Sequence, residues 1–459
     1  MNEPEASTHP SLSRRNLIGS AITAGAAGAL VGVPGAAAAA APPKGNAKSE
    51  KRPATVFFKD EALNFQMLFA LGGAGYGASE VGEVLAAFDR IHGKGDTYRA
   101  TYEEFLRLGR QTRGRADEER AAGRTASARS SYLRAAMYLD QALFYTLASK
   151  TPTRHQEGVV YTEMEGAFAG AAALFKPRFE PVRIPWSGGT MPGWFLSPGG
   201  KGPRPTVILN NGSDAQNIDM YVYGGAAALE RGWNALILEG PGQGSNLFLR
   251  SQVFIPDWER VIIPVVDFLR ARPDVDRRRI SLIGQSFGGF LIARAAAHEH
   301  RLAALVPDPG VHDPFLDWQQ ELPPSLLKLL SEEKAREFDA IWDQIPANVS
   351  AAQAFGIAKR SEIYGNGGGY ERMSNASRFV MQRAEARQIT APVGICSPEL
   401  ENFFPGQPET MHKWLGSQSS LLKFTVAEGA EYHCEPMAPQ LRNERVFDWL
   451  ETNARPLKA

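Results

Sequence analysis

The chain of 459 residues contains only two cysteines, no excess of either charge and no long apolar run. Two cysteines cannot form a disulfide framework, and separate buried thiols at Cys396 and Cys434 are favoured over a disulfide between them. The 50 basic and 50 acidic residues argue against nucleic acid or an acidic membrane surface as the main partner. Because no apolar run is long enough, we expect no permanent membrane span.

Signals for a metal ion or a nucleotide are also missing. No group of histidine, cysteine and acidic residues has the spacing of metal ligands. The glycine-rich run at 240–244 follows a predicted strand. It lacks the Lys-Ser/Thr ending of a phosphate-binding loop and the G-x-G-x-x-G spacing of a dinucleotide site. We therefore expect no cofactor and no metal, and we interpret this run as a structural turn beside the functional site.

A G-x-S-x-G run centred on Ser286 is the motif that points to an activity. Gly284 and Gly288 flank the serine, an apolar β-branched stretch precedes it, and an apolar, alanine-rich stretch follows. Strand, sharp turn and helix are the context of a nucleophile elbow, whose tight turn lifts the serine hydroxyl above the sheet. The run alone is a weak signal in a glycine-rich chain, so residues further along must decide.

A nucleophile elbow requires an acid and then a histidine later in the chain. His433 follows the last predicted strand and precedes the last predicted helix, and Glu401 lies in the loop after the preceding strand. We expect His433 to take the serine proton and the carboxylate to hold the imidazole in the right tautomer. Glu401 is favoured because Pro405 follows it at a spacing common in hydrolases, and Glu399 in the same loop is the alternative.

Backbone donors for an oxyanion are predicted from two segments. The first donor is the N–H of Phe287, directly after the serine. The second should come from the loop after the third strand, where Gly212 lets the backbone approach closely and either Ser213 or Asp214 supplies the N–H. Acidic residues also follow a later predicted strand, where they are predicted to line the substrate pocket. The alternative is that they are ordinary solvated carboxylates of a loop. The candidate substrate-binding residues are Gly212, Asp317 and Trp318.

Composition and the spacing of apolar residues divide the chain into three parts. We expect a signal and linker at 1–45, an α-helical cap domain at 55–178 and a catalytic domain at 180–459 with a helical lid insertion at about 311–390. Strands that alternate with helices predict an α/β fold with a mostly parallel, doubly wound sheet, whose ligands lie beyond the carboxyl ends of the strands. The eight predicted strands are 181–185, 193–197, 206–210, 234–239, 280–283, 303–307, 392–396 and 421–426.

Helices are predicted where apolar residues recur at three- and four-residue steps. The first helical part shows this pattern best at 102–108 and 126–147, and we expect glycine and charged clusters at 93–96 and 113–119 to break it into several helices. Within the insertion and at the carboxyl end, the predicted helices are 324–342, 351–359, 375–387 and 439–449.

The amino end carries a twin arginine, Arg14-Arg15, followed by a mild Ala/Gly-rich stretch and an alanine tract with A-x-A options. This pattern is typical of a twin-arginine export signal, so we expect an exported protein, either periplasmic or extracellular. The alternative is a disordered alanine-rich tail with a chance arginine pair on a cytoplasmic protein.

These motifs resemble the α/β-hydrolase superfamily, and within it the branch with a helical domain ahead of the hydrolase fold. That branch includes the 2,6-dihydroxypseudooxynicotine hydrolases, the fungal polyketide-shortening hydrolases and the fermentation–respiration-switch-like proteins. The resemblance rests on residues 127–135, 239–244, 284–289 and 433–435. It implies an α/β-hydrolase fold with an eight-stranded sheet, a site between the two domains and a homodimer. Glutamate as the acid and the export signal both depart from this pattern.

The sequence therefore predicts a serine hydrolase that works through an acyl-enzyme on a small-molecule substrate. Cleavage of a C–C bond next to a ketone follows the resemblance, whereas cleavage of an ester or lactone follows the wider superfamily. Peptidase activity is a weaker alternative. A non-catalytic binding protein that kept the fold is disfavoured by the ordered serine, acid and histidine.

Overall fold

Eight strands form one sheet at the centre of the computed structural model, which describes residues 56–454. Their order is β1-β2-β4-β3-β5-β6-β7-β8, and β2 is antiparallel to β1 and β4, whereas the remaining pairs are parallel. This confirms the predicted mostly parallel sheet. The strands are β1 (Glu180–Trp186), β2 (Gly189–Leu196), β3 (Arg204–Asn210), β4 (Asn234–Leu238), β5 (Val275–Gln285), β6 (Ala304–Asp308), β7 (Val393–Pro398) and β8 (Ser419–Phe424).

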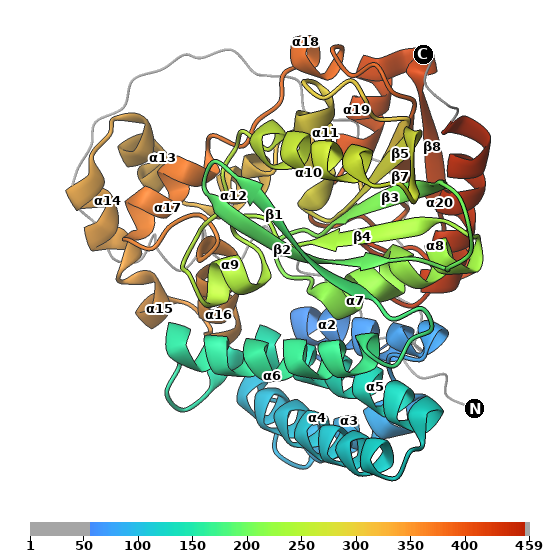
Figure 1. Ribbon diagram of the computed structural model, residues 1–459. Helices are drawn as coiled ribbons and strands as arrows, with labels where there is room; N and C mark the ends of the chain where they lie inside the picture. The colour runs from blue at the N-terminus through green and yellow to red at the C-terminus, as the bar shows by residue number, and fades with distance from the viewer. Residues whose placement is uncertain (1–55, 455–459) are drawn as a thin grey trace, which may run out of the picture.

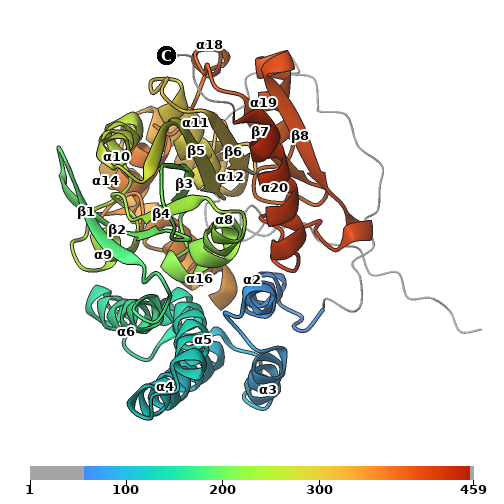
Figure 2. The same cartoon turned by 45° about the vertical axis from the view of Figure 1, so that its right-hand side comes forward.

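The central strands are buried on both faces, which is why their sequences are almost continuously apolar. Helices α10 (Glu259–Ala271), α11 (Gly288–Ala296) and α19 (Gln407–Leu415) pack on one side of the sheet. Helices α8 (Ala226–Glu230) and α20 (Pro439–Asn453) cover the other side (Figures 1 and 2). Because β3 to β8 run in the same direction, their carboxyl ends meet at one edge of the sheet.

A bundle of helices precedes the sheet in sequence and lies against one end of the α/β part. Helices α2, α5 and α6 lie next to the α/β part, and α3 and α4 lie farther from it (Figures 1 and 2). Helix α5 is buried along most of its length because it packs between α4 and α6. The bounds are α2 (Glu61–Gly72), α3 (Val81–His92), α4 (Tyr98–Ala121), α5 (Thr125–Phe144) and α6 (Arg154–Ala172).

The charged cluster at 113–119 does not break a helix, as we expected it to. It lies inside the continuous helix α4, whose buried Thr112 and Ala116 keep the helical spacing while the charged residues face outward. Arginine and glutamate are good helix formers, and a single glycine in an exposed helix costs only about 1 kcal/mol. Arg115 also pairs with Glu83 of α3 at 2.9 Å, which adds a favourable contact outside the helix.

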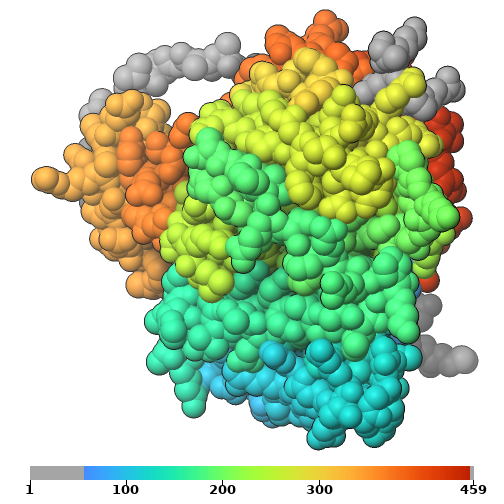
Figure 3. All heavy atoms as spheres, in the orientation of Figure 1, coloured from blue at the N-terminus to red at the C-terminus, as the bar shows by residue number. Residues whose placement is uncertain are grey.

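Seven helices fill the segment between β6 and β7, and most of them form a lobe beside the α/β body (Figure 3). The predicted helix at 375–387 is wrong over most of its length. Phe379 and Met381 are both buried, two residues apart, in an extended stretch that packs against α11, and the Met381 N–H donates to the carbonyl of His312 at 2.8 Å. The helices are α12 (Phe315–Glu321), α13 (Pro324–Ser331), α14 (Ala335–Trp342), α15 (Ile345–Asn348), α16 (Ala351–Ser361), α17 (Gly369–Ala376) and α18 (Arg383–Ala386).

A buried carboxylate joins the helical bundle to the sheet. Glu239, directly after β4, accepts hydrogen bonds from the Tyr161 hydroxyl of α6 at 2.6 Å and from Ser245 Oγ at 2.7 Å. The glycine-rich run 240–244 turns tightly around it, because a Cβ at Gly244 would lie 2.2 Å from the Glu239 carboxyl carbon. This run therefore shapes a structural turn that allows the Glu239 carboxylate to be buried.

Candidate active site

Ser286 sits at the sharp turn between β5 and α11. Its φ of +58° is a left-handed conformation that residues with a Cβ rarely adopt, and its N–H donates to the Asp308 carbonyl at 2.6 Å. The flanking glycines are required by space: a Cβ at Gly284 would lie 2.3 Å from the carbonyl oxygen of Gly288. The turn is therefore the strained strand-to-helix elbow that the motif predicted.

The loops after β7 and β8 bring an acid and a histidine to this serine. His433 Nε2 lies 2.9 Å from Ser286 Oγ, and His433 Nδ1 lies 2.7 Å from Glu401 Oε2. The rings of Phe403 and Phe404 lie 4.7 and 5.7 Å from the imidazole. The side chains of His433 and Glu401 are each only 5% exposed, so water screens their interaction weakly.

The two glutamates of the loop after β7 have different surroundings. Glu401 Oε1 accepts the N–H groups of Phe403 and Phe404 at 2.8 and 2.9 Å, which leaves Oε2 directed at the imidazole. Glu399 instead accepts the N–H of Val426 at 2.9 Å, at the end of β8. The geometry therefore places Glu401, and not Glu399, beside His433.

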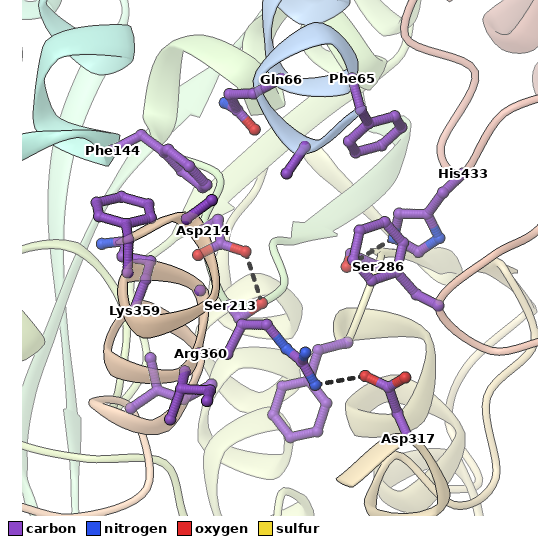
Figure 4. A pocket seen from close by; sticks show the side chains of 18 of the residues that line it. Phe65, Gln66, Phe144, Ser213, Asp214, Ser286, Asp317, Lys359, Arg360 and His433 are labelled. Atoms are coloured by element: carbon purple, nitrogen blue, oxygen red, sulfur yellow. Dashed lines mark hydrogen bonds and ion pairs between the residues drawn. The ribbon is translucent and has the colours of Figure 1, made fainter. Parts of the chain in front are cut away.

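The loop after β3 presses against the elbow. A Cβ at Gly212 would lie 2.9 Å from Ser286 Cβ and 3.0 Å from the Phe287 nitrogen, so only glycine permits this approach. Ser213 and Asp214 line a cavity next to the elbow, and the Ser213 hydroxyl donates to Asp214 Oδ2 at 3.0 Å (Figure 4). The predicted oxyanion segments thus meet at Ser286, with Gly212 as their contact point.

A cavity of about 480 Å³ opens above Ser286, between the sheet edge, the helical bundle and helix α16 (Figure 4). Predicted residues Asp317 and Trp318 both line it. Arg360 pairs with Asp317 and with Glu321, at 2.8 Å to the latter, and its guanidinium lies 4.5 Å from the centre of the Trp318 ring. The aromatic lining residues are Phe65, Phe69, Tyr98, Phe144, Tyr145, Phe287, Trp318, Phe355, Tyr364, Phe403 and Phe404.

Charged residues on the roof of this cavity were missed by sequence reasoning. Asp140 of α5 lines the cavity at 5% exposure, and burial followed by the nearby Asp219 carboxylate raises its pKa well above the ordinary value. Lys359 of α16 lies 2.7 Å from Glu362. Burial alone would lower the pKa of Lys359, but Glu362 and Glu157 keep it above the ordinary value. No local motif marks these residues, because packing of α5 against α16 brings them together.

The two cysteines are free and buried, as the sequence favoured. Burial raises the pKa of both thiols well above the ordinary value, which makes them poor nucleophiles. Among residues 56–454, no group of three or more His, Cys, Asp or Glu side chains could hold a metal ion. Within the same residues, no helix is long and apolar enough to cross a bilayer.

Comparisons with known proteins found a family model and solved structures that are similar to this chain. The model of the family described as "Esterase FrsA-like" matches residues 108–334. The solved structure of 2,6-dihydroxy-pseudo-oxynicotine hydrolase aligns over 83% of this chain and 95% of its own, with 21% identity and a TM-score of 0.61. The chain has the α/β-hydrolase fold. The match to that structure extends through the helical bundle, as expected for the predicted branch with a helical part ahead of the sheet.

Fungal relatives support the same assignment of this α/β hydrolase. Hydrolase LUC6 of a Fusarium species is 28% identical over 423 residues, which cover 86% of this chain and 97% of the relative. The 20-hydroxy-prefusarin hydrolase FUS2 of Gibberella moniliformis is 29% identical over 275 residues, which cover 58% of this chain and 64% of the relative. The chain is therefore an enzyme of the hydrolase class.

Proposed function

We propose that this α/β hydrolase is a serine hydrolase in which Ser286, His433 and Glu401 act as a catalytic triad. One observation carries the proposal: His433 lies within hydrogen-bond distance of both Ser286 Oγ and Glu401 Oε2, at 2.9 and 2.7 Å, on the wall of the cavity. A nucleophile, a base and an orienting acid in this order constitute the working unit of serine hydrolases.

The triad would act in two half-reactions. In the first, His433 takes the proton of Ser286 as Oγ attacks the substrate carbonyl, and Glu401 stabilises the imidazolium. The N–H of Phe287 and an N–H from the loop of Ser213 and Asp214 would hold the oxyanion. Collapse of the tetrahedral intermediate breaks the bond to the leaving group, which receives the proton from His433. In the second half-reaction, a water activated by His433 releases the acid and regenerates Ser286.

Two leaving groups fit this sequence of steps. From an ester or lactone, the leaving group is the alcohol. The match to the FrsA-like esterase family supports this first case. From a β-diketone or aryl ketone, the leaving group is a carbon fragment, which takes up the same proton from His433. The structural relative named for 2,6-dihydroxy-pseudo-oxynicotine supports this second case. The aromatic lining of the cavity suits a planar, small organic substrate in either case.

An activity panel tests the reaction class. Purified protein would be assayed against aryl esters and lactones beside aryl ketones and β-diketones, with Ser286→Ala as the control. We expect turnover in at least one set and its loss in the variant. Turnover of neither set by folded protein, or equal turnover by Ser286→Ala, would contradict the proposal and favour a binding protein.

We also propose that the protein is exported and that it forms a homodimer. The twin-arginine segment lies outside the residues that the structure describes. A secreted form beginning near residue 41 would support export, and its absence from the exported fraction would argue for the cytoplasmic alternative. Light scattering of the purified protein would decide between monomer and dimer.

A further inference from the structure

Three fully buried charged residues lie beside the proposed triad without lining the cavity. Asp308 ends β6, Glu435 follows His433 by two residues, and Arg442 lies in the first turn of α20. Arg442 Nε donates to Asp308 Oδ2 at 2.8 Å, and its Nη1 donates to the Tyr223 carbonyl at 2.9 Å. All three charged residues are 0% exposed, so every charge in this cluster must be balanced within the protein.

Four polar atoms of this cluster have no hydrogen-bond partner among residues 56–454. They are both carboxyl oxygens of Glu435, Asp308 Oδ1 and Arg442 Nη2. An ionised carboxylate buried without a donor is strongly disfavoured. With both carboxyls ionised, the cluster would carry two negative charges and one positive charge.

One proton removes this imbalance. A protonated Glu435 can donate to the Asp308 carboxylate, and the cluster is then neutral. Burial and, next, the Asp308 carboxylate raise the pKa of Glu435 well above its ordinary value, whereas Arg442 opposes this. Charge balance and hydrogen bonding thus lead to the same protonation state.

The cluster is tied directly to both ends of the Ser–His pair. The Asp308 carbonyl accepts the Ser286 N–H at 2.6 Å and the Cys434 thiol at 3.4 Å. On the histidine side, Cys434 and Glu435 have φ values of +58° and +47°, which are unfavourable for residues with a Cβ. The turn that presents His433 therefore has a strained backbone, and the fully buried Glu435 side chain lies at its end.

We propose that Glu435 is a positioning residue that shares a proton with Asp308 and thereby fixes the turn of His433 relative to the elbow of Ser286. This inference rests on the proposed function of Ser286 and His433. Glu435 does not contact the cavity, so it acts on the reaction only through the placement of His433.

Two substitutions of similar size separate positioning from bulk packing. Glu435→Gln keeps the shape and a donor for Asp308, whereas Glu435→Leu fills the space without a donor. We expect Glu435→Gln to keep kcat within about threefold of the original chain, and Glu435→Leu to lower kcat by about ten- to hundredfold with little change in KM, because misplacement of a catalytic group by about 1 Å costs that much. Glu428→Gln, at an exposed ion pair with Arg445 in the preceding loop, is the control.

An infrared difference spectrum tests the proton without any activity assay. When the spectrum of Glu435→Gln at neutral pH is subtracted from that of the unsubstituted chain, one carbonyl band of a solvent-shielded protonated carboxylic acid should be left. Other buried acids that keep a proton, such as Glu165, contribute to both spectra and cancel. A fluorophosphonate reaction of the unsubstituted chain is run in parallel. If the unsubstituted chain is not labelled, the proposed function fails, while the infrared result still judges the protonation of Glu435.

The outcomes divide cleanly. The acid band together with rescue by Gln but not by Leu supports the proposal. Absence of the band, or equal kcat in Glu435→Gln and Glu435→Leu, overturns it. If Glu435→Leu does not fold, the band and the kcat of Glu435→Gln still decide.

Discussion

The two walls of the cavity differ in how they are built. The floor consists of loops at the carboxyl ends of β3, β5, β7 and β8, and its side chains are held by short, specific hydrogen bonds around Ser286, His433 and Glu401. The roof consists of helices α2, α5 and α16, and it presents aromatic rings with a few buried charges. From this difference we propose that the residues of the floor carry out the reaction and that those of the roof select the substrate.

Loss of the nucleophile should have the largest effect. We expect Ser286→Ala to lower kcat on the order of 10⁴- to 10⁶-fold, because no other group can form the acyl-enzyme. The measurement is kcat on the best substrate of the panel, with the melting temperature as a check of folding. Residual activity within about tenfold would mean that the floor does not perform the reaction through Ser286.

The acid of the floor should come next. We expect Glu401→Gln to lower kcat on the order of 10³- to 10⁴-fold, because an amide cannot stabilise the imidazolium of His433. Glu399→Gln is the matched control in the same loop, and it should keep kcat within about twofold because Glu399 bonds the Val426 N–H instead. A reversed order of the two variants would exchange the assignment of the acid.

A change in the roof should alter selection and leave the reaction intact. Phe355 of α16 lines the cavity and stacks on Tyr145, with ring centres 5.6 Å apart. We expect Phe355→Ala to shift the ratio of kcat/KM between a bulky and a small substrate by about tenfold, since pocket contacts of this kind are worth about 1–3 kcal/mol. Labelling of Ser286 by a small fluorophosphonate should stay within about threefold.

The matched control is Phe175→Ala, which removes a ring stacked on Phe179 in the connection between α6 and β1, away from the cavity. It should leave the substrate ratio unchanged. If Phe355→Ala slows labelling of Ser286 as much as it slows turnover, the floor and the roof do not act separately.

The joint, which is the buried contact of helix α6 with β2 and with Glu239 after β4, should make the stability of the protein depend on pH. Glu165 of α6 accepts from Trp194 Nε1 at 2.8 Å, and burial, followed by the Glu239 carboxylate, raises its pKa from 4.5 to about 8. The folded state therefore keeps this proton while the unfolded state releases it above about pH 4.5. This contribution to the free energy of unfolding is complete below pH 4.5 and is lost as the pH rises to about 8.

Glu165→Gln removes the titrating group and should flatten this slope when denaturant midpoints are measured between pH 4.5 and 8. Glu163→Gln is the control, because Glu163 lies two residues away in a surface ion pair with Arg110. An unchanged slope in Glu165→Gln would show that the joint does not hold a proton in this range.

The floor was predictable from the sequence to a larger extent than the roof. The eight strands lie close to their predicted positions because their apolar, β-branched runs are local signals. The positions of Ser286, Glu401 and His433 follow from strand order, since parallel strands end at one edge of the sheet. The geometry around Ser286 agrees with the expected arrangement.

The roof could not be predicted because it depends on packing between distant segments. Asp140 and Lys359 lie more than two hundred residues apart in the chain, and neither belongs to a motif. The segment 375–387 has helical periodicity on paper, yet it extends so that Phe379 can pack against Phe287, with ring centres 5.2 Å apart. At the joint, the glycine-rich run 240–244 was predicted to be a turn, but the buried hydrogen bond from Tyr161 to Glu239 had no local signal.

Labelling with a fluorophosphonate probe tests the central claim most directly. We expect one adduct per chain, mapped by peptide mass spectrometry to Ser286, with labelling lost in Ser286→Ala and strongly slowed in His433→Ala. We also expect Phe355→Ala to be labelled nearly as fast as the unsubstituted chain. An adduct on another residue, or no adduct on folded protein, would contradict the proposal that Ser286 is the nucleophile.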